Sequence, residues 1–275
     1  MSQTNGSESM QTASVVFAAG KGSRMHGFEG NKTLLPLVPG ASLYEGERPM
    51  LLEVLSNLPP GPKGIVVHHR ADDVESATEG LGVQYIFQPE TNGTGGALLA
   101  AGPFLESVED DNVIVTMGDV PLIRRSTYSQ LIAQLKDHAF VLLAFEPVDR
   151  AQYGMIEMDE GEILRIVEWK YWSLYDASRQ KQLRYCNAGV YAARRPMLLH
   201  TLEFLARNPH AVRKQRGDAW VTIQEYFLTD LVEMMHADGL RTAMVEAPEE
   251  EVMGVDTPEM LSTVQRIYGK KGGLH

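Results

Sequence analysis

The stretch SVVFAAGKGSRM, residues 14–25, decides how the chain begins to fold. Its first half, from Ser14 to Ala18, has the length and the β-branched content of a buried strand. Gly20 and Gly22 follow, and glycine lets the backbone turn sharply and approach a ligand closely. The stretch therefore predicts a strand that leads directly into a loop of the phosphate-binding kind.

Two familiar phosphate motifs do not fit this loop. A P-loop has the pattern G-x-x-x-x-G-K-S/T, whereas Gly20-Lys21-Gly22-Ser23 is too compact for it. A dinucleotide fingerprint has the pattern G-x-G-x-x-G, and Met25 stands where the third glycine belongs. What remains is either a simple tight turn or a group of backbone N–H donors flanked by Lys21 and Arg24, which suits a polyphosphate.

Composition limits the class of protein. The chain has 275 residues, of which 44% are hydrophobic, and this is enough for one α/β domain with a sizeable core. We predict a polar tail at 1–13, the domain at 14–268 and a C-terminal tail at 269–275. With no leader-like start and no apolar run long enough for a bilayer, we expect a soluble cytoplasmic protein without a membrane partner. Cys186 is the single cysteine, and we expect a packed thiol.

The formal charge of −11 argues against nonspecific nucleic-acid binding, because no basic surface is implied that could displace counterions. An anionic substrate would need a local positive site. Lys21, Arg24 and Lys32 supply one around the first glycine loop, unless they are simply solvated.

Strand-like and helix-like segments alternate through the first half of the chain, which predicts a mostly parallel sheet with helices on both faces. The expected strands are 14–18, 63–68, 83–87, 112–117 and 139–145, and the expected helices are 49–58, 71–79, 95–105 with an interruption at Pro103, and 127–136. The pattern then changes to an inserted β-hairpin, 154–159 and 162–167, around Glu160-Gly161. Later come a strand at 187–193, helices at 196–206, 224–236 and 257–268, and an exposed loop at 213–218.

Ligands of open α/β sheets bind beyond the carboxyl ends of the strands, so the motifs at those positions belong together. They are AAGKGSRM (18–25), NKTLLPL (31–37), QPETNGTGGALLAA (88–101), GDVPLI (118–123), YGMI (153–156), IVEWK (166–170), NAGVY (187–191), EYFLTD (225–230) and GVDTPEM (254–260). This ordered series resembles the sugar nucleotidyltransferase family, in particular the uridyltransferase domain of bacterial N-acetylglucosamine-1-phosphate uridyltransferases. The resemblance spans roughly 14–268 and implies a single Rossmann-like nucleotidyltransferase domain.

The resemblance also implies a reaction, in which a nucleoside triphosphate and a sugar 1-phosphate give a nucleotide sugar and pyrophosphate with the help of Mg²⁺. The sugar phosphate oxygen is already ionised, so the protein mainly aligns the reactants and neutralises charge. The implied partners are therefore these small molecules, and the oligomeric state stays open.

The resemblance assigns roles to particular residues. They are Arg24 and Lys32 for catalysis; Phe17, Ala18, Ala19, Gly20, Lys21, Gln88, Gly93 and Thr94 for the nucleotide; Gly118, Gly154, Glu168, Lys170 and Asn187 for the sugar; and Asp119 and Asp256 for the metal. Gln88 and Gly93-Thr94 match positions that recognise uracil, which favours UTP, and a glutamine can offer both a donor and an acceptor.

Each of these residues also has an ordinary structural interpretation. Gln88 can simply end a strand before a turn at Asn92-Gly93. Asp119 can cap a turn, and Asp256 can cap the helix that begins near Pro258. The sugar-contact positions can be turn residues or, for Glu168 and Lys170, a solvated strand.

Some motifs depart from the family pattern. The usual Pro-Lys is Asn31-Lys32, Tyr-Gly-Asp is Met117-Gly118-Asp119, Val-Glu-His-Lys-Asp is Val167-Glu168-Trp169-Lys170-Tyr171, and the segment 37–50 is longer. The aromatic residues of EWKYW (168–172) either remodel the sugar pocket or cover the hairpin. The alternatives are a molybdenum-cofactor guanylyltransferase, which NKTLLPL resembles, a cytidylyltransferase, or a nucleotide-sugar binding protein without catalysis.

Overall fold

The computed structural model describes residues 11–216 and 219–272. Strand β1 (Thr12–Phe17) lies in the middle of the main sheet, parallel to both of its neighbours. Its Val15 and Phe17 face one hydrophobic core and its Val16 faces the other. The opening stretch is apolar on both faces because both faces of this strand are covered.

The main sheet is mixed and mostly parallel, as predicted. Its principal order is β13 (Thr242–Glu246), β7 (Phe140–Phe145), β10 (Cys186–Arg194), β6 (Asn112–Met117), β1, β4 (Lys63–Val67) and β5 (Gln84–Phe87). Strand β10 runs antiparallel to β6 and β7, whereas the other pairs along this order are parallel. The amino end of β10 therefore lies at the same edge as the carboxyl ends of its neighbours.

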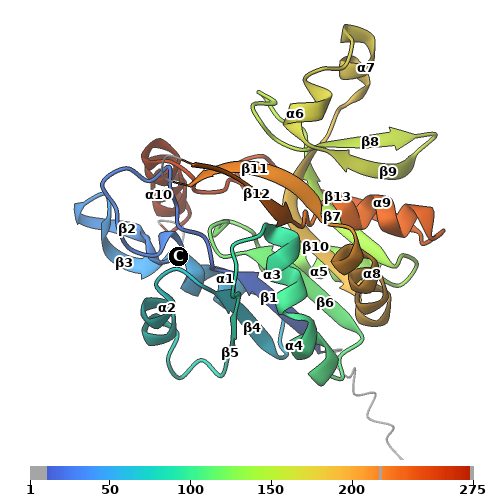
Figure 1. The fold of residues 1–275 in the computed structure, drawn as a ribbon. Coiled ribbons are helices and arrows are strands. Elements are labelled where there is room, and N and C mark those ends of the chain that lie inside the picture. The colour runs from blue at the N-terminus through green and yellow to red at the C-terminus, as the bar shows by residue number, and fades with distance from the viewer. Residues whose placement is uncertain (1–10, 217–218, 273–275) are drawn as a thin grey trace, which may run out of the picture.

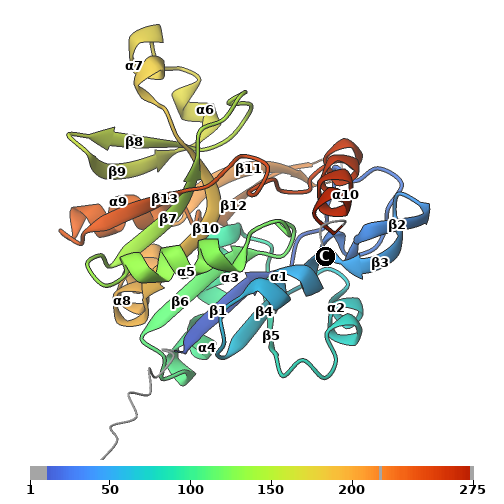
Figure 2. The same cartoon turned by 180° about the vertical axis from the view of Figure 1, so that it is seen from behind.

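Helices cover both faces of this sheet (Figures 1 and 2). One core includes α3 (Thr94–Ala100), α4 (Gly102–Ser107), α8 (Arg195–Arg207) and α9 (Asp230–Ala237). The other includes α1 (Met50–Asn57), α2 (Ala71–Ala77) and α5 (Arg125–Gln134). The predicted interruption is present as the junction between α3 and α4. Cys186 is buried, and burial raises the pKa of its thiol to about 12, which agrees with a packed thiol.

A third core joins the two ends of the chain. Helix α10 (Pro258–Gly272) packs on the hairpin of β2 (Pro36–Ser42) and β3 (Glu45–Pro49), which accounts for the unusually long segment 37–50. The Gln265 amide donates to the backbone oxygens of Pro36 (2.8 Å) and Leu43 (3.0 Å). Regular structure thus extends beyond the predicted domain limits, from Thr12 to Gly272, while 1–10 and 273–275 lie outside the described residues.

Two predictions in the last third of the chain are wrong. The segment expected to be an exposed loop belongs to β11 (His210–Arg216), which pairs with β12 (Ala219–Glu225) in a separate hairpin; residues 217 and 218 lie outside the described part. The helix expected at 224–236 begins at Asp230 as α9. Apolar Val221 and Ile223 alternate with polar residues, and this period of two makes a strand. Strand β13 was not predicted either.

The predicted hairpin of β8 (Met155–Asp159) and β9 (Glu162–Val167) is confirmed. Strand β8 pairs with β10 at Met155 and Cys186, and from this junction the hairpin projects together with α6 (Trp169–Trp172) and α7 (Ala177–Gln182), at the top of Figures 1 and 2. The chain that leaves the hairpin turns at once into helix α6, so Lys170 is on a helix and not on a strand.

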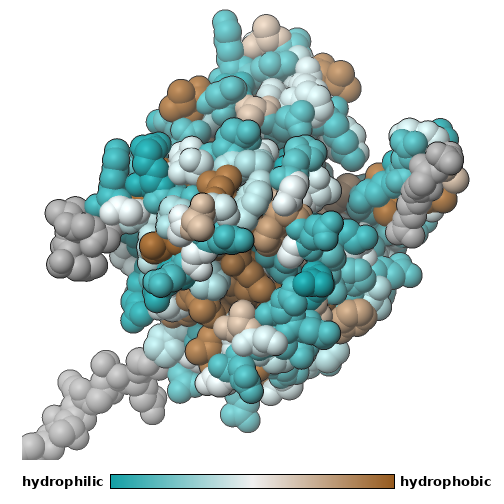
Figure 3. Space-filling view, turned by 90° about the vertical axis from the view of Figure 1, so that its left-hand side faces the viewer, coloured by the Kyte–Doolittle hydropathy of each residue, from teal (hydrophilic) through white to brown (hydrophobic). Residues whose placement is uncertain are grey.

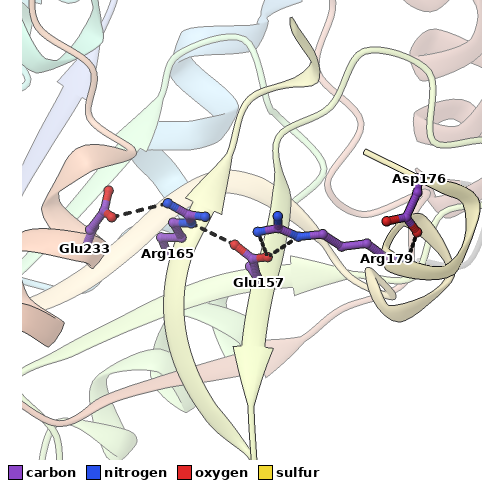
Figure 4. A network of polar contacts seen from close by, with 5 residues as sticks. All are labelled: Glu157, Arg165, Asp176, Arg179 and Glu233. Atoms are coloured by element: carbon purple, nitrogen blue, oxygen red, sulfur yellow. Dashed lines mark hydrogen bonds and ion pairs between the residues drawn. The ribbon is translucent and has the colours of Figure 1, made fainter. Parts of the chain in front are cut away.

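Glu157 ties this projecting region together (Figure 4). Its two carboxylate oxygens accept from Arg165 Nε at 2.7 Å and from Arg179 Nη2 at 2.6 Å, and Arg165 also reaches Glu233 of α9. Burial alone would raise the pKa of Glu157, but the hydrogen bonds from Arg179 and Arg165 hold it below the usual value.

None of the helices within the described residues is long and apolar enough to cross a membrane. The face turned toward the viewer in Figure 3 is mainly hydrophilic, and its hydrophobic residues gather near the middle.

We expect Glu157→Gln to lower the melting temperature at pH 7, by the equivalent of about 1 kcal/mol because both arginines are partly exposed. A lowered pKa in the folded state stabilises above the ordinary glutamate pKa, and this contribution is lost as the pH falls through the folded value. Thermal melts from pH 7 to pH 3 should therefore show the gap between parent and variant closing in acid. A gap that stays constant over this range would contradict the assignment.

Candidate active site

The loop after β1 has a backbone that requires glycine at one point. Gly22 has φ +62°, and a Cβ there would come within 3.0 Å of Lys32 Cβ. Both the positive φ and the close approach favour glycine. The first glycine loop is therefore packed directly against the segment that carries Lys32.

The Asn31 side chain fixes the position of this loop through hydrogen bonds. Its amide nitrogen donates to the backbone oxygens of Ala18 (2.8 Å) and His69 (2.9 Å). Its Oδ1 accepts from the Thr33 backbone N–H (3.0 Å) and hydroxyl (2.8 Å), and so caps the short helix η1 (Lys32–Leu34). The asparagine that replaces the family's proline thus joins β1, the segment after β4 and η1 through one buried side chain.

The Lys32 ammonium lies between two carboxylates. Its Nζ is 2.5 Å from Asp119 Oδ2 and 2.6 Å from Asp256 Oδ1. Arg24 reaches the other oxygen of Asp256 at 2.9 Å. The Lys32 side chain is only 11% exposed, so burial alone would lower the pKa of Lys32, but the two carboxylates raise it above the usual value. The predicted catalytic and metal-binding side chains therefore form one cluster.

Asp256 does not cap helix α10, which was the alternative interpretation. Thr257 has that place, since its hydroxyl accepts from the Met260 N–H at 3.3 Å and its backbone oxygen accepts from Leu261. The Asp256 carboxylate instead contacts cations. The Val255 N–H donates to the Asp119 backbone oxygen (3.0 Å), so the two carboxylates are also linked through the main chain.

A cavity of about 310 Å³ opens beside this cluster. It is lined by Phe17, Ala19, Gly20, Lys32, Thr33, Gln88, Thr91, Gly93, Thr94, Ala97, Met117, Asp119, Lys214 and Glu225. Most of the residues predicted for the nucleotide are thus in one cavity with Lys32 and Asp119. Two others do not line it: Ala18 is buried in the core on the opposite side, and the Lys21 side chain is exposed.

Gln88 lines the cavity, and the nitrogen of its side-chain amide is hydrogen-bonded within the protein. Its Nε2 donates to Asn92 Oδ1 (3.1 Å) and to the Gly93 backbone oxygen (3.3 Å). A primary amide has two N–H donors, so both are used and Oε1 is left as an acceptor. In this structure Gln88 therefore has an acceptor left for a ligand, whereas the donor that we also expected of it is engaged by Asn92 and Gly93.

Three of the residues predicted for the sugar form a second cluster. The Asn187 N–H donates to the Gly154 backbone oxygen at 2.9 Å, and a Cβ on Gly154 would lie 3.8 Å from the Glu168 carboxylate. Glu168 itself accepts from the Thr229 hydroxyl at 2.9 Å. Two others lie elsewhere: Lys170 Nζ is over the Phe227 ring, and Gly118 packs on Phe17. None of the five lines the 310 Å³ cavity.

Lys214 and Glu225 are cavity residues that sequence reasoning missed. They come from the β11–β12 hairpin and form an ion pair with each other. The alternating pattern from Val221 to Glu225 was the available signal, since it predicts a strand with one inward face.

The family described as the MobA-like NTP transferase domain matches residues 14–156. The chain belongs to this family. The predicted sugar nucleotidyltransferase resemblance is thereby confirmed as to family, and the site lies at the expected edge of its sheet.

Curated relatives extend the similarity over the rest of this nucleotidyltransferase chain. The bifunctional protein GlmU of Ruegeria pomeroyi is 32% identical over 265 residues, which are 94% of this chain and 53% of that protein. The bifunctional protein GlmU of Alcanivorax borkumensis is 33% identical over 261 residues, 94% of this chain and 52% of that protein. The chain thus spans about half the length of the curated relatives it matches.

Solved structures agree on the fold. The uridine diphosphate N-acetylglucosamine pyrophosphorylase of Trypanosoma brucei has a TM-score of 0.70 at 15% identity, covering 93% of this chain and 65% of that one. A putative glucose-1-phosphate thymidylyltransferase of Bacillus anthracis has a TM-score of 0.64 at 17% identity, covering 94% and 95%.

We expect Asn31→Ala to lower the free energy of unfolding by about 2–3 kcal/mol, because it leaves buried backbone oxygens without donors. Asn57→Ala is the matched control, since Asn57 donates a single bond to Glu53 and should cost well under half as much. Urea denaturation measures both. Equal losses for the two variants would show that Asn31 does not organise the loop.

Proposed function

We propose that this domain joins a nucleoside triphosphate, preferably UTP, to a sugar 1-phosphate and releases pyrophosphate. The observation that carries the proposal is the meeting of Lys32, Asp119 and Asp256 at the mouth of a cavity formed by the glycine loop and Gln88. This combines cations, paired carboxylates and a backbone-lined pocket, which are the parts that phosphoryl transfer requires.

The reaction needs little proton chemistry from the protein. An ionised oxygen of the sugar phosphate attacks the α-phosphorus of the triphosphate, a new P–O bond forms, and the bond to the bridging oxygen breaks. Pyrophosphate leaves with the negative charge. Lys32 and Arg24 would stabilise that charge, and the glycine loop would hold the phosphates in line.

The acidic residues fit a magnesium ion. One carboxylate oxygen of Asp119 and one of Asp256 contact the same Lys32 ammonium, so the two oxygens lie close together. Within the described residues, no group of three or more histidine, cysteine, aspartate or glutamate side chains is placed so that it could hold a metal ion without other ligands. Mg²⁺ suits such a site because it keeps several waters and takes phosphate oxygens as ligands. When bound there, it would neutralise phosphate charge, and Lys32 would be free to donate to a phosphate oxygen.

The nucleotide preference follows from Gln88. Its free Oε1 is an acceptor and suits the N3–H of uracil. Cytosine and adenine carry acceptors on the corresponding ring nitrogen and are disfavoured, whereas guanine carries an N–H donor. The contact therefore supports UTP and argues against CTP, and it keeps GTP and dTTP as competitors because thymine carries the same N3–H as uracil.

The sugar is proposed from the second cluster and from the relatives. A carboxylate at Glu168 and an amide at Asn187 can hydrogen-bond sugar hydroxyl or acetamido groups. Together with the name of the Trypanosoma brucei neighbour, they favour N-acetylglucosamine 1-phosphate or a related sugar.

Pyrophosphate release from a matrix of UTP, GTP, CTP and dTTP against several sugar 1-phosphates, with magnesium, tests the proposal. UTP with an N-acetylhexosamine 1-phosphate should give the fastest release. A GTP or CTP preference would reject the UTP assignment, and binding without turnover would indicate a nucleotide-sugar binding protein.

We expect Lys32→Ala and Arg24→Ala to reduce turnover by about 100-fold or more, since each removes a cation from the leaving pyrophosphate. Arg70→Ala is the control, because Arg70 is exposed and pairs locally with Asp73. Arg24→Ala and Arg70→Ala should melt within a few degrees of the parent, whereas Lys32→Ala leaves Asp119 and Asp256 without their shared cation and is assayed at a temperature at which it remains folded. Parental turnover in the well-folded Lys32 and Arg24 variants would remove both from the mechanism.

We also expect activity to require a divalent cation. Asp119→Asn should lose most activity, and Asp256→Asn should lose less, because Asp119 lines the cavity whereas Asp256 lies outside its lining and is more exposed. Asp73→Asn, on an exposed surface, is the control. Assays across a magnesium titration measure this, and full synthesis in excess chelator would rule out the metal.

A further inference from the structure

The β11–β12 hairpin forms part of the cavity wall although it lies far along the chain from the first glycine loop. It crosses above α3 and extends toward α10 (Figures 1 and 2). It contributes Lys214 and Glu225 to the cavity that Gly20 and Lys32 also line. Both residues lie outside the part matched by the family, 14–156, and no role has been assigned to either.

The root of the hairpin is fixed to the loop that carries Gly93. The Tyr226 N–H donates to the Asn92 backbone oxygen, and the Gly95 N–H donates to the Tyr226 backbone oxygen, both at 2.9 Å. A Cβ on Gly93 would lie 2.3 Å from that same oxygen of Tyr226. Glu225, which directly precedes Tyr226, is therefore held at the edge of the cavity.

The pairing register places Arg213 and Lys214, two neighbouring cations of β11, on opposite faces of the hairpin. Lys214 pairs with Val221, which is half-buried, whereas Arg213 pairs with the exposed Thr222. Residues paired across an antiparallel ladder share a face, so Lys214 is on the cavity side and Arg213 on the outer side. The Arg213 guanidinium indeed lies over the ring of Trp220, which is 61% exposed.

The charged residues that line the cavity indicate a role for Lys214. Among the described lining residues the cations are Lys32 and Lys214, and the anions are Asp119 and Glu225. These charges cancel, and Lys32 is already engaged by two carboxylates. Beside the proposed Mg²⁺ and Arg24, Lys214 is therefore the lining cation with fewer carboxylate contacts and can be recruited by a bound triphosphate. Lys214 has one carboxylate partner and a side chain that is 45% exposed, so its flexible stem can move.

We propose that Lys214 binds the polyphosphate of the nucleotide, exchanging its contact with Glu225 for a phosphate oxygen when the nucleotide enters. The inference rests on the proposed function in one respect, namely that the cavity receives a nucleoside triphosphate. Glu225 then acts as the counter-ion that keeps Lys214 over the empty cavity.

Calorimetric binding of UTP, UMP and uridine, in the presence of magnesium, tests this without requiring turnover. Lys214→Gln should weaken UTP binding by about tenfold or more, the usual effect of one lost charged contact. The loss should shrink for UMP and vanish for uridine. Arg213→Gln removes the same charge from the outer face and should bind like the parent, and Lys214→Arg should restore most of the affinity.

Several results would overturn the proposal. Equal weakening by Lys214→Gln and Arg213→Gln would indicate general attraction by a basic hairpin, and equal weakening for UTP and uridine would indicate contact with the nucleoside. Unchanged binding would remove Lys214 from the site. Glu225→Gln, which releases Lys214, should bind UTP at least as well as the parent. A loss of affinity as large as that of Lys214→Gln would mean that the ion pair stabilises the hairpin and that Lys214 does not contact phosphate.

The binding and turnover results are separable. A parent protein that binds UTP through Lys214 but releases no pyrophosphate would support this inference and reject the proposed enzyme. If the parent turns over GTP instead, the same series is measured with GTP, GMP and guanosine. A parent that binds no nucleoside triphosphate would overturn both.

Discussion

The ion pairs of Lys32 are the interaction on which the arrangement of the site depends. They join η1, the segment after β6 and the segment before α10, which are far apart in the sequence. Burying an ammonium group is costly unless carboxylates compensate, so the three segments hold one another in place. Because α10 also packs on the β2–β3 hairpin, the C-terminal helix keeps Asp256 close to the first glycine loop.

The sheet explains why so many separate motifs meet. Parallel β1, β5 and β6 end at one edge, and the loops that follow them carry Gly20, Gln88 and Asp119. Antiparallel β10 adds Asn187 to that edge from its amino end. The reversed strand thus brings Asn187, one residue of the cluster predicted for the sugar, to the sheet edge at which the predicted nucleotide cavity opens.

Most of the sheet could be predicted because periodicity identifies strands. The residues around Lys32 were expected to lie together from the family resemblance and from the meeting of loops at the ends of parallel strands. The first strand of the β11–β12 hairpin could not be predicted, since its basic sequence looks like a solvated loop; the second strand has an alternating pattern, but its pairing with the first is visible only in three dimensions. The contact of Lys214 with Glu225 depends on that pairing. The orientation of the Gln88 amide and the choice of Thr257 over Asp256 as the helix cap depend on individual hydrogen bonds, which residue types do not specify.

The anchoring of the β11–β12 hairpin has an evolutionary consequence. Its root is bonded through the main chain to the Asn92–Gly95 loop, where two glycines leave room for the Tyr226 backbone, so this junction tolerates little change. The rest of the hairpin pairs only with itself as a separate two-stranded sheet. Its strands can therefore lengthen, shorten or change charge without disturbing the neighbouring Gln88. Diversification of the end proposed to bind phosphate is in this way uncoupled from the end proposed to read the base.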